Sequence, residues 1–194
     1  VNSLNINAPS IEGFLFPDTY IFLSSYTEKQ IITLMVNQFF LKYKKHISGF
    51  KNKNLPSMRH VVTMASIIQG EAMFDDEMST ISSVYHNRLK RKMLLQADPT
   101  IQYIVPGKNI RLYNKHLKLD SPYNTYMYKG LPPGPINNPG LAALKAAVKP
   151  DVTNYLFFVA DGEGRHIFTR NNNDHNKAKK ILQKKRREMR RNRK

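Results

Sequence analysis

The chain contains no cysteine and no tryptophan among its 194 residues. Without cysteine it has no disulfide bonds, no thiolate metal ligands and no cysteine nucleophile, although this does not identify a redox compartment. No apolar run approaches the ~20 residues of a membrane span, and the first residues lack the basic and apolar regions of a signal peptide. Because the sequence begins at Val1, we expect it to be a processed or trimmed piece.

Acidic residues are also scarce, with 14 Asp or Glu against 31 Lys or Arg and a formal net charge of +17. The charge is uneven, because residues 177–194 hold eleven basic residues and the single acid Glu188. Such a run either attracts anionic polymers and surfaces or forms a solvated, flexible helix end. It has no aromatic residue for stacking on bases, so we expect no specific nucleic-acid partner. We expect one main domain over residues 1–176, followed by a basic helix or tail over 177–194.

Most of the remaining chain has helical patterning. Apolar residues recur every three or four positions in three stretches, 27–45, 57–72 and 75–92. Asp98-Pro99 and Asn138-Pro139 each have the pattern of an N-cap followed by the first helical residue, which predicts two further helices, ending near Ile104 and Val148.

Strands are fewer than helices. We expect a short strand over 20–23, after Pro17, and a β-hairpin over 155–160 and 165–170 around the turn Asp161–Gly164. Residues 105–137 are rich in proline and glycine and too long for an ordinary connection, so they form a candidate binding loop. The fold class is therefore α+β, a helix-rich domain with a small β-hairpin and a long irregular loop.

Glu71 is the most informative carboxyl group. Its neighbours three, four and seven positions earlier are Ile68, Ile67 and Met64, which places the acid on the apolar face of the second helix. Burial and the negative end of the helix dipole should both raise its pKa, as expected for a carboxyl group that donates a proton near neutral pH. The same pattern also fits a partly exposed glutamate at a helix end, or one paired with a distant arginine.

Other catalytic patterns are missing. The six histidines form no HExxH motif or i/i+4 pair, and no GxSxG, GxGxxG or GxxxxGK[ST] motif occurs, so we expect neither a metal site nor a cofactor. Asp98 is a candidate second carboxylate, although its position before Pro99 favours helix capping, and Asp18 has the pattern of a turn former.

Several segments together resemble one known family, the YceG-like endolytic murein transglycosylases. The similar segments, in order, are 11–20 (IEGFLFPDTY), 65–72 (ASIIQGEA), 87–89 (NRL), 95–100 (LQADPT), 121–126 (SPYNTY), 130–136 (GLPPGPI), 138–140 (NPG) and 155–162 (YLFFVADG), followed by His175-Asn176. Each is weak alone, but together they span nearly the whole chain.

The resemblance implies cleavage of peptidoglycan strands internally, between N-acetylmuramic acid and N-acetylglucosamine, leaving a 1,6-anhydro end. The family's catalytic glutamate is the second acid of an Ala-Ser-Ile-Val-Glu-Lys-Glu-like motif, which matches Glu71, whereas the first acidic position here is Gln69. Because the muramic C6 hydroxyl serves as internal nucleophile, one carboxyl group suffices, first as acid and then as base. The implied substrate-binding residues are Gln96, Asp98, Tyr123, Asn124 and Tyr126.

The resemblance also implies a membrane anchor outside this chain, an extracytoplasmic catalytic part and wall synthases as neighbours. Two other functions stay open. A muramidase would pair Asp98 or Asp18 with Glu71 to activate water, and would give reducing ends. A basic module that binds nucleic acid or anionic surfaces would lose its function when residues 177–194 are deleted, whereas cleavage would be largely kept. We expect no pyridoxal-phosphate chemistry, because the apolar helix carries Glu71 instead of a Schiff-base lysine.

Overall fold

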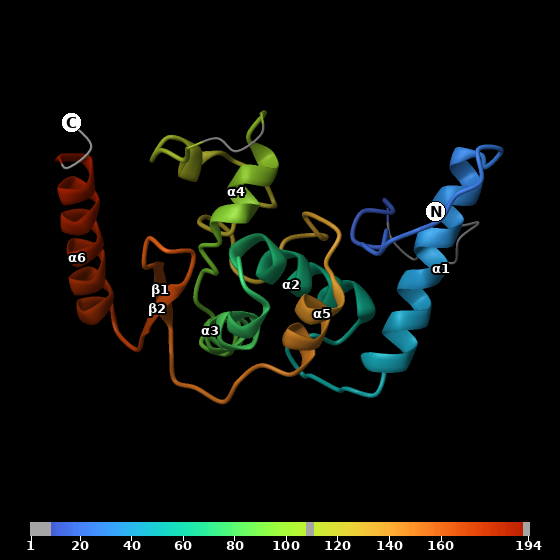
Figure 1. The fold of residues 1–194 in the computed structure, drawn as a ribbon. Coiled ribbons are helices and arrows are strands. Elements are labelled where there is room, and N and C mark those ends of the chain that lie inside the picture. Colours follow the sequence, from blue (N-terminus) through green and yellow to red (C-terminus); the bar gives the residue numbers. More distant parts are fainter. Residues whose placement is uncertain (1–8, 108–110, 192–194) are drawn as a thin grey trace.

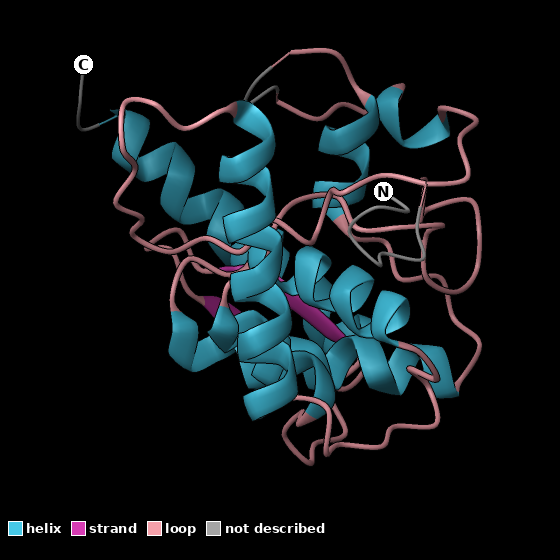
Figure 2. Cartoon of the chain, turned by 90° about the vertical axis from the view of Figure 1, so that its right-hand side faces the viewer, coloured by secondary structure: helices cyan, strands magenta, loops and turns pink. Residues whose placement is uncertain are grey.

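The structure is a computed structural model that describes residues 9–107 and 111–191, with side chains up to Lys184. Six α-helices, two short 3₁₀ helices (Asp75–Glu77 and His116–Lys118) and one two-stranded sheet make up the regular structure of this part (Figure 1). They are α1 (Glu28–His46), α2 (Met58–Glu71), α3 (Met78–Lys90), α4 (Asp98–Ile104), α5 (Leu141–Val148), β1 (Phe157–Ala160), β2 (His166–Thr169) and α6 (Asn172–Arg191). Figure 2 shows how little of the chain is strand, and the predicted α+β class is confirmed.

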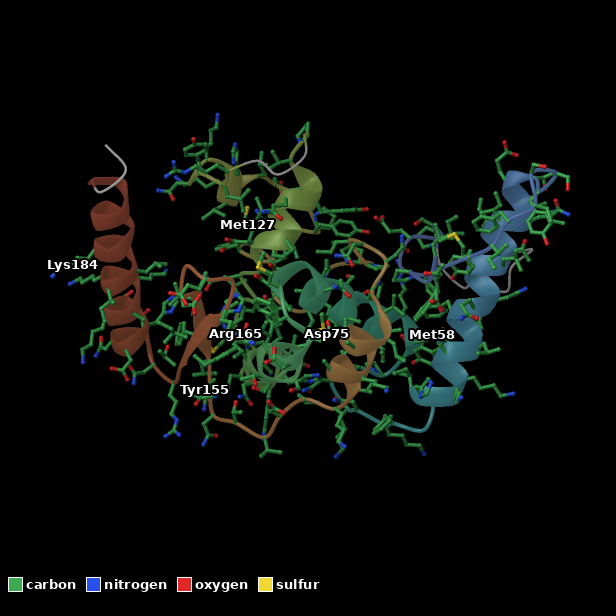
Figure 3. The ribbon with its side chains drawn as sticks, in the orientation of Figure 1. Met58, Asp75, Met127, Tyr155, Arg165 and Lys184 are labelled. Carbon is green, nitrogen blue, oxygen red and sulfur yellow. The ribbon has the colours of Figure 1, made fainter. Side chains whose placement is uncertain are left out.

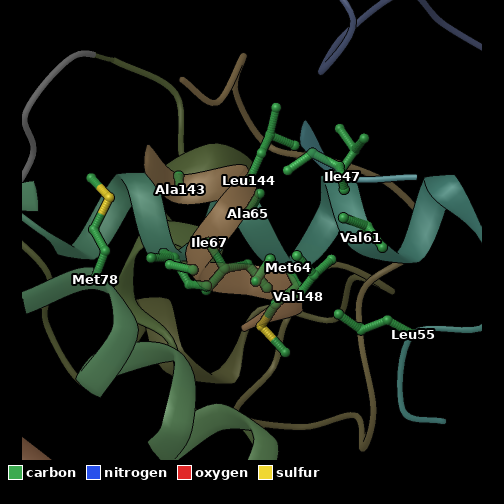
Figure 4. Packing of buried hydrophobic residues seen from close by; sticks show 14 of the residues in the cluster. Ile47, Leu55, Val61, Met64, Ala65, Ile67, Met78, Ala143, Leu144 and Val148 are labelled. Carbon is green, nitrogen blue, oxygen red and sulfur yellow. The ribbon is translucent and has the colours of Figure 1, made fainter. Parts of the chain in front are cut away.

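Helix α2 forms the centre of the core. Its residues from Val61 to Ile68 are all buried, since α5 packs along one side of the helix, α3 and α4 contact others, and α3 also contacts α5. Figure 4 shows Met64 and Ile67 of α2 beside Leu144 and Val148 of α5. Burying each large apolar side chain contributes about 1.5–3 kcal/mol to folding. The core therefore holds the C-terminal end of α2, where Glu71 lies, on a rigid support.

Helix α1 closes one side of this core. It begins with a capping box in which Thr27 accepts from the backbone N–H of Gln30 and Gln30 reciprocates. Its buried residues include Val36, Phe39 and Tyr43, and the ring of Phe39 meets that of Phe14 edge to face at 5.0 Å. The predicted helix over 27–45 is thus confirmed within a residue at each end.

The predicted strand over 20–23 is wrong. These residues belong to a coil segment that pairs with no strand of the described residues, and Ile21 and Leu23 are 93% and 63% exposed. Tyr20 and Phe22 stack on each other at 5.7 Å, and the Tyr20 hydroxyl donates to the Phe16 carbonyl. The apolar run therefore reflects local aromatic contacts, not sheet pairing.

Both predicted N-caps before proline are also wrong. The cap of α5 is Gly140, and the Asn138 side chain instead accepts from the backbone N–H groups of Gly13 and Leu15, at 2.8 and 3.2 Å. The cap of α4 is Ala97, so Asp98 is the first helical residue. Each polar side chain is thereby freed for a contact distant in sequence.

The long segment before α5 is irregular, as predicted, apart from one short 3₁₀ turn at His116–Lys118. In its described part, from residue 111, it is anchored to the body at several points. Thr125 accepts from the backbone N–H groups of Gln96 and Ala97, and the Ile136 N–H donates to the Ser66 hydroxyl in α2.

The hairpin and α6 form the end of the molecule opposite α1 (Figure 1). Strands β1 and β2 pair antiparallel, with Phe157 opposite Thr169 and Ala160 opposite His166, which confirms the hairpin with strands shorter than predicted. Helix α6 packs on both strands through Ala178 and Leu182. None of the helices in the described ranges is both long and apolar enough to cross a membrane.

Candidate active site

A pocket of about 520 Å³ opens between the C-terminal end of α2, the start of α4, the hairpin and α6. Its ionisable side chains are Glu71, Arg88, Asp98, Tyr126, His166, His175 and Lys179. Two other hollows, along Arg59 and Pro132 and on α1, are lined by no carboxyl group. A pocket that combines apolar walls with converging ionisable groups is where chemistry is expected.

Glu71 lies in this pocket as the last residue of α2 and is half-buried. The Tyr85 hydroxyl donates to its Oε1 at 2.7 Å, and the backbone N–H of Asp98 donates to the same carboxyl group. Both donors come from other elements, since Tyr85 lies on α3 and Asp98 begins α4. The orientation of the acid is therefore set by three helices together.

The pKa of Glu71 is raised to about 7, chiefly because burial disfavours the charged form. The Asp98 carboxylate raises it further, while the two hydrogen bonds and the positive charge of Arg88 lower it by less than burial raises it. The raised pKa predicted from the sequence is confirmed, with burial as its main cause. Near neutral pH the group populates both forms, as an acid that later serves as a base requires.

Tyr85 is the partner that sequence analysis missed. It is 1% exposed, it packs edge to face against Phe158 at 5.8 Å, and burial together with Glu71 raises its pKa well above the usual range. It therefore stays protonated and always donates. The sequence signal was faint, because its fourteen-residue separation from Glu71 brings the two together only through the packing of α2 and α3.

Asp98 and Tyr126 form a second polar pair in the pocket. The Tyr126 hydroxyl donates to Asp98 Oδ1, and burial and the Asp98 charge raise the pKa of Tyr126. Of the five residues predicted to bind sugars, Gln96, Asp98 and Tyr126 line the pocket with Glu71. Asp98 is the first residue of α4, Gln96 lies just before the cap of that helix, and Tyr126 belongs to the irregular segment.

Gln96 adopts an unusual backbone conformation, with φ of 50°. A residue other than glycine in this left-handed region carries strain of about 1–3 kcal/mol and needs strong local support. That support comes from Thr125, whose carbonyl accepts the Gln96 N–H at 3.0 Å, and from Arg88, whose Nη1 donates to Gln96 Oε1 at 3.3 Å. Strained residues held in this way are concentrated at functional sites.

Arg88 is buried in the pocket wall and joins two backbone segments by hydrogen bonds. It is 7% exposed, and it donates to the carbonyls of Leu156 and Leu95 at 2.6 and 2.8 Å. Its guanidinium lies 5.1 Å from the centre of the Phe157 ring. Within the part of the chain that the structure describes, no carboxylate forms an ion pair with Arg88. The alternative in which Glu71 pairs with a distant arginine is therefore not observed.

His166 forms the hairpin side of the pocket and is held by Glu77. The carboxylate of Glu77 accepts from the His166 backbone N–H at 3.0 Å and contacts Nδ1 at 3.2 Å. Nearby, Arg165 pairs with Asp76 at 3.0 Å. Figure 3 shows Arg165 on the hairpin, and these contacts attach the hairpin to the turn between α2 and α3. The hairpin wall is therefore fixed relative to Glu71.

Tyr123 and Asn124 lie outside the pocket lining. Asn124 is fully buried, and its amide donates to the carbonyls of Leu117 and Leu119 and accepts from the Tyr126 N–H. The ring of Tyr123 packs against that of Tyr103 at 4.9 Å. Asn124 thus shapes the loop that presents Tyr126, and the structure does not bring these two residues to Glu71.

Comparison with known proteins now gives the family. The model of the YceG-like family matches residues 2–181. The chain belongs to the YceG-like family. Among curated relatives, the endolytic murein transglycosylase of Bacillus subtilis is 44% identical over 176 residues, and that of Streptococcus pneumoniae is 34% identical over 173. A crystal structure of a putative yceG-like protein from Listeria monocytogenes matches with a TM-score of 0.78 and 38% identity.

This YceG-like chain spans only part of those relatives. The matches cover 90% and 86% of the chain, but 48% of the Bacillus protein and 31% of the Streptococcus protein. The Listeria structure is matched over 91% of this chain and 58% of its own.

Gln69 stands where the resemblance expects the first acid of the motif, and the structure shows where this side chain lies. Gln69 Oε1 accepts from the Gly140 N–H at 3.0 Å, which joins α2 to the start of α5. Gln69 is absent from the pocket lining, whereas Glu71 is present. Of the two positions, Glu71 lines the pocket, whereas Gln69 makes a structural contact with α5.

Proposed function

We propose that this chain is an endolytic lytic transglycosylase, which cleaves the bond between N-acetylmuramic acid and N-acetylglucosamine within murein strands and leaves 1,6-anhydro ends. The observation that carries the proposal is Glu71, a half-buried acid with a pKa of about 7 that lies in a pocket and is held by Tyr85 and the Asp98 N–H. The printed names of the relatives support the substrate class.

In the first step, protonated Glu71 donates its proton to the glycosidic oxygen, which leaves with the N-acetylglucosamine unit as C4–OH. Because Oε1 accepts the Tyr85 hydroxyl, the proton is carried on Oε2. An oxocarbenium-like state develops at C1 of the muramic sugar as the bond breaks. The muramic C6 hydroxyl then attacks C1, and its proton passes to the Glu71 carboxylate. The acid is thereby restored, and no water is consumed.

Gln96, Asp98 and Tyr126 supply the sugar contacts in this proposal. Their positions around Glu71 suit hydrogen bonding to hydroxyl and acetamido groups, and Tyr126 offers a ring face. The strained conformation of Gln96, supported by Arg88 and Thr125, keeps this polar side chain at the pocket instead of in the core. Tyr123 and Asn124 keep the loop in shape.

A muramidase is the second candidate, because Asp98 lies in the same pocket as Glu71. Two carboxyl groups around one glycosidic bond are the usual arrangement for hydrolysis by water. Against this, one Asp98 oxygen already accepts the Tyr126 hydroxyl, and its N–H supports Glu71 directly. Asp98 thus has a positioning role that needs no activated water.

Mass analysis of murein strands incubated with the chain tests the proposal. We expect internal products with 1,6-anhydro ends, and a loss of at least about 100-fold in rate for Glu71→Gln, because the proton donor is gone. Glu28→Gln is the matched control, since it removes the same charge from the exposed start of α1. Products one water heavier would favour the muramidase, and wild-type activity in Glu71→Gln would contradict both mechanisms.

The resemblance also supports a cellular setting. We propose that the catalytic part works outside the cytoplasm, is anchored to the membrane by a segment outside this chain, and acts beside wall synthases. Fractionation of the native full-length protein tests the location, and cross-linking in growing cells tests the neighbours. Recovery of the full-length protein from the cytosol would contradict this setting.

A further inference from the structure

Helix α6 contributes one face to the pocket, although sequence analysis assigned much of it to a basic tail. Asn172, His175, Lys179 and Leu182 line the pocket and follow one another at intervals of three or four residues. This spacing places them on one side of the helix. The charged part of the chain thus borders the same cavity as Glu71.

The wall is fixed in place by apolar contacts. Ala178 and Leu182 are each 7% exposed, and the ring of His175 stacks on that of Phe157 in β1 at 5.2 Å. A side chain added at Gly162, in the hairpin turn, would lie 3.3 Å from Leu182. Lys179, one residue after Ala178, is therefore carried by an anchored helix and not by a loose end.

Lys179 has no ionic partner within the described part of the chain, whereas Lys177 on the same helix pairs with Asp174 at 3.5 Å. The other pocket cation, Arg88, already donates to carbonyl oxygens. His175 is 9% exposed, and its Nδ1 has no hydrogen-bond partner among the described residues. This wall is thus positive, with donor capacity that the protein itself does not use.

The acids of the pocket come from other elements. Glu71 belongs to α2 and Asp98 to α4, and each accepts a hydrogen bond from a tyrosine hydroxyl. The nearby carboxylate of Glu77 already contacts His166. Burial, together with the nearby positive charges of Lys179 and Arg88, lowers the pKa of His175. Because Lys179 has no ionic partner among the described residues, an anion in the pocket would gain most at the α6 wall.

We propose that the Lys179 side of α6 binds a carboxylate of the peptide stems that project from the glycan strand. This rests on the proposed function, because the stems are the carboxylate-bearing branches of a murein strand. A lysine suits the task, since its compact charge and three rotatable donors can follow a flexible peptide. The enzyme would then distinguish strands that carry stems from strands that have been stripped of them.

Binding is measured first in the Glu71→Gln background, so that no strand is cut. The two ligands are uncross-linked glycan strands of one length, one with its stems and one after an amidase has removed the stems and the lactyl carboxylates that this exposes have been converted to amides. We expect about fivefold tighter binding of the stem-bearing strands, a preference that weakens in high salt because the contact is partly exposed. Lys179→Gln should abolish the preference without changing the affinity for stripped strands.

Two control variants isolate the position from the charge. Lys180→Gln removes the same charge from the next residue of α6, which is exposed and outside the pocket lining, and it should keep the preference. Lys179→Arg should keep most of it. The proposal is overturned if neither strand binds, if both bind equally, or if Lys180→Gln and Lys179→Gln lose the preference to the same degree.

Cleavage by the chain with Glu71 intact separates this proposal from the proposed function. Equal cleavage of both strand types would contradict the stem subsite and leave the transglycosylase assignment in place. A Lys179-dependent binding preference without any strand cleavage would support the subsite and contradict the assignment. For an active enzyme we expect Lys179→Gln to raise KM for stem-bearing strands about fivefold at nearly constant kcat.

Discussion

At the scale of single residues, the pKa of Glu71 is set by neighbours that are distant in sequence. Burial in the pocket and the Asp98 charge raise its pKa, and the Tyr85 hydroxyl and Arg88 limit the rise. Without these two contributions the pKa of Glu71 would be higher still. The result, a pKa of about 7, suits one group that alternates between two roles.

The same shift makes a prediction about stability. The folded-state pKa of Glu71 is raised from 4.5 to about 7, so its stabilising contribution is complete below pH 4.5 and is lost as the pH rises through 7. Ionisation at pH 8 therefore costs the wild type about 2–3 kcal/mol of unfolding free energy relative to pH 4.5.

Urea unfolding of wild type and Glu71→Gln at pH 4.5 and pH 8 checks this prediction. We expect the variant to be similar to wild type at the lower pH and about 2 kcal/mol more stable at pH 8, because an amide does not ionise. Other titrating groups cancel in the comparison. Parallel pH dependence of the two proteins would show that Glu71 has an ordinary pKa.

At the scale of elements, the approach of α4 to α2 builds the site. Gly70 permits it, since a Cβ at this position would lie 2.7 Å from Pro99 Cβ. The contact places Asp98, next to Pro99, within reach of Glu71, next to Gly70. A glycine that weakens the last turn of α2 by about 1 kcal/mol is thus explained by the geometry of the pocket.

Gly70→Ala is expected to separate these helices. The added methyl group should cost about 1–3 kcal/mol of stability and should displace the Asp98 N–H from the Glu71 carboxyl group, with a loss of at least about tenfold in strand cleavage. Gly49→Ala is the matched control, because nothing lies within 4 Å of a Cβ there. Full activity in a folded Gly70→Ala protein would contradict this account of the site.

Sequence patterns predicted the helices and the inward position of Glu71 at the end of α2 well, because both depend on local spacing. The apolar stripe of α2 ends at Glu71, so periodicity alone placed this residue on the buried face. The strand predicted over 20–23 was wrong, because its apolar residues have high strand propensity but pair with no strand among the described residues. The N-cap predicted at Asn138 was wrong, because its side-chain oxygen accepts from the backbone N–H groups of Gly13 and Leu15 instead of capping α5.

The remainder of the site depends on tertiary packing and could not be read from spacing. Tyr85 reaches Glu71 only because α3 packs beside α2, and Arg88 donates to the carbonyls of Leu156, just before β1, and of Leu95, next to Gln96. Asn124 and Tyr126 are two residues apart in one motif, yet one is buried in the loop and the other faces the pocket. No local pattern separates these two outcomes.

At the scale of the whole molecule, α6 and the hairpin close the pocket on the side opposite α4. The charge pattern of the sequence predicts a boundary at residue 177, and with it that cleavage survives deletion of 177–194. In the structure α6 runs continuously across that position, and Ala178 and Leu182 beyond it are buried. The first turns of the basic segment therefore belong to the pocket wall.

Truncation tests this arrangement. A chain that ends at residue 176 should lose about 3 kcal/mol of unfolding free energy, since Ala178 and Leu182 no longer cover the hairpin, and its strand cleavage should fall with the loss of the wall. A chain that ends at Lys184 keeps these contacts and should match the full chain. Thermal unfolding and product analysis of both chains make the comparison, and equal behaviour would mean that the wall is dispensable.

The pocket combines an acid from α2 with a wall from α6, and this has a consequence during synthesis. The ribosome completes Glu71 and its support in α2 about a hundred residues before α6 is made. A nascent chain that has not yet released residues 172–184 carries the acid but only an open, three-sided groove. The pocket is therefore complete only after residues 172–184 have left the ribosome, when α6 can fold back onto the hairpin.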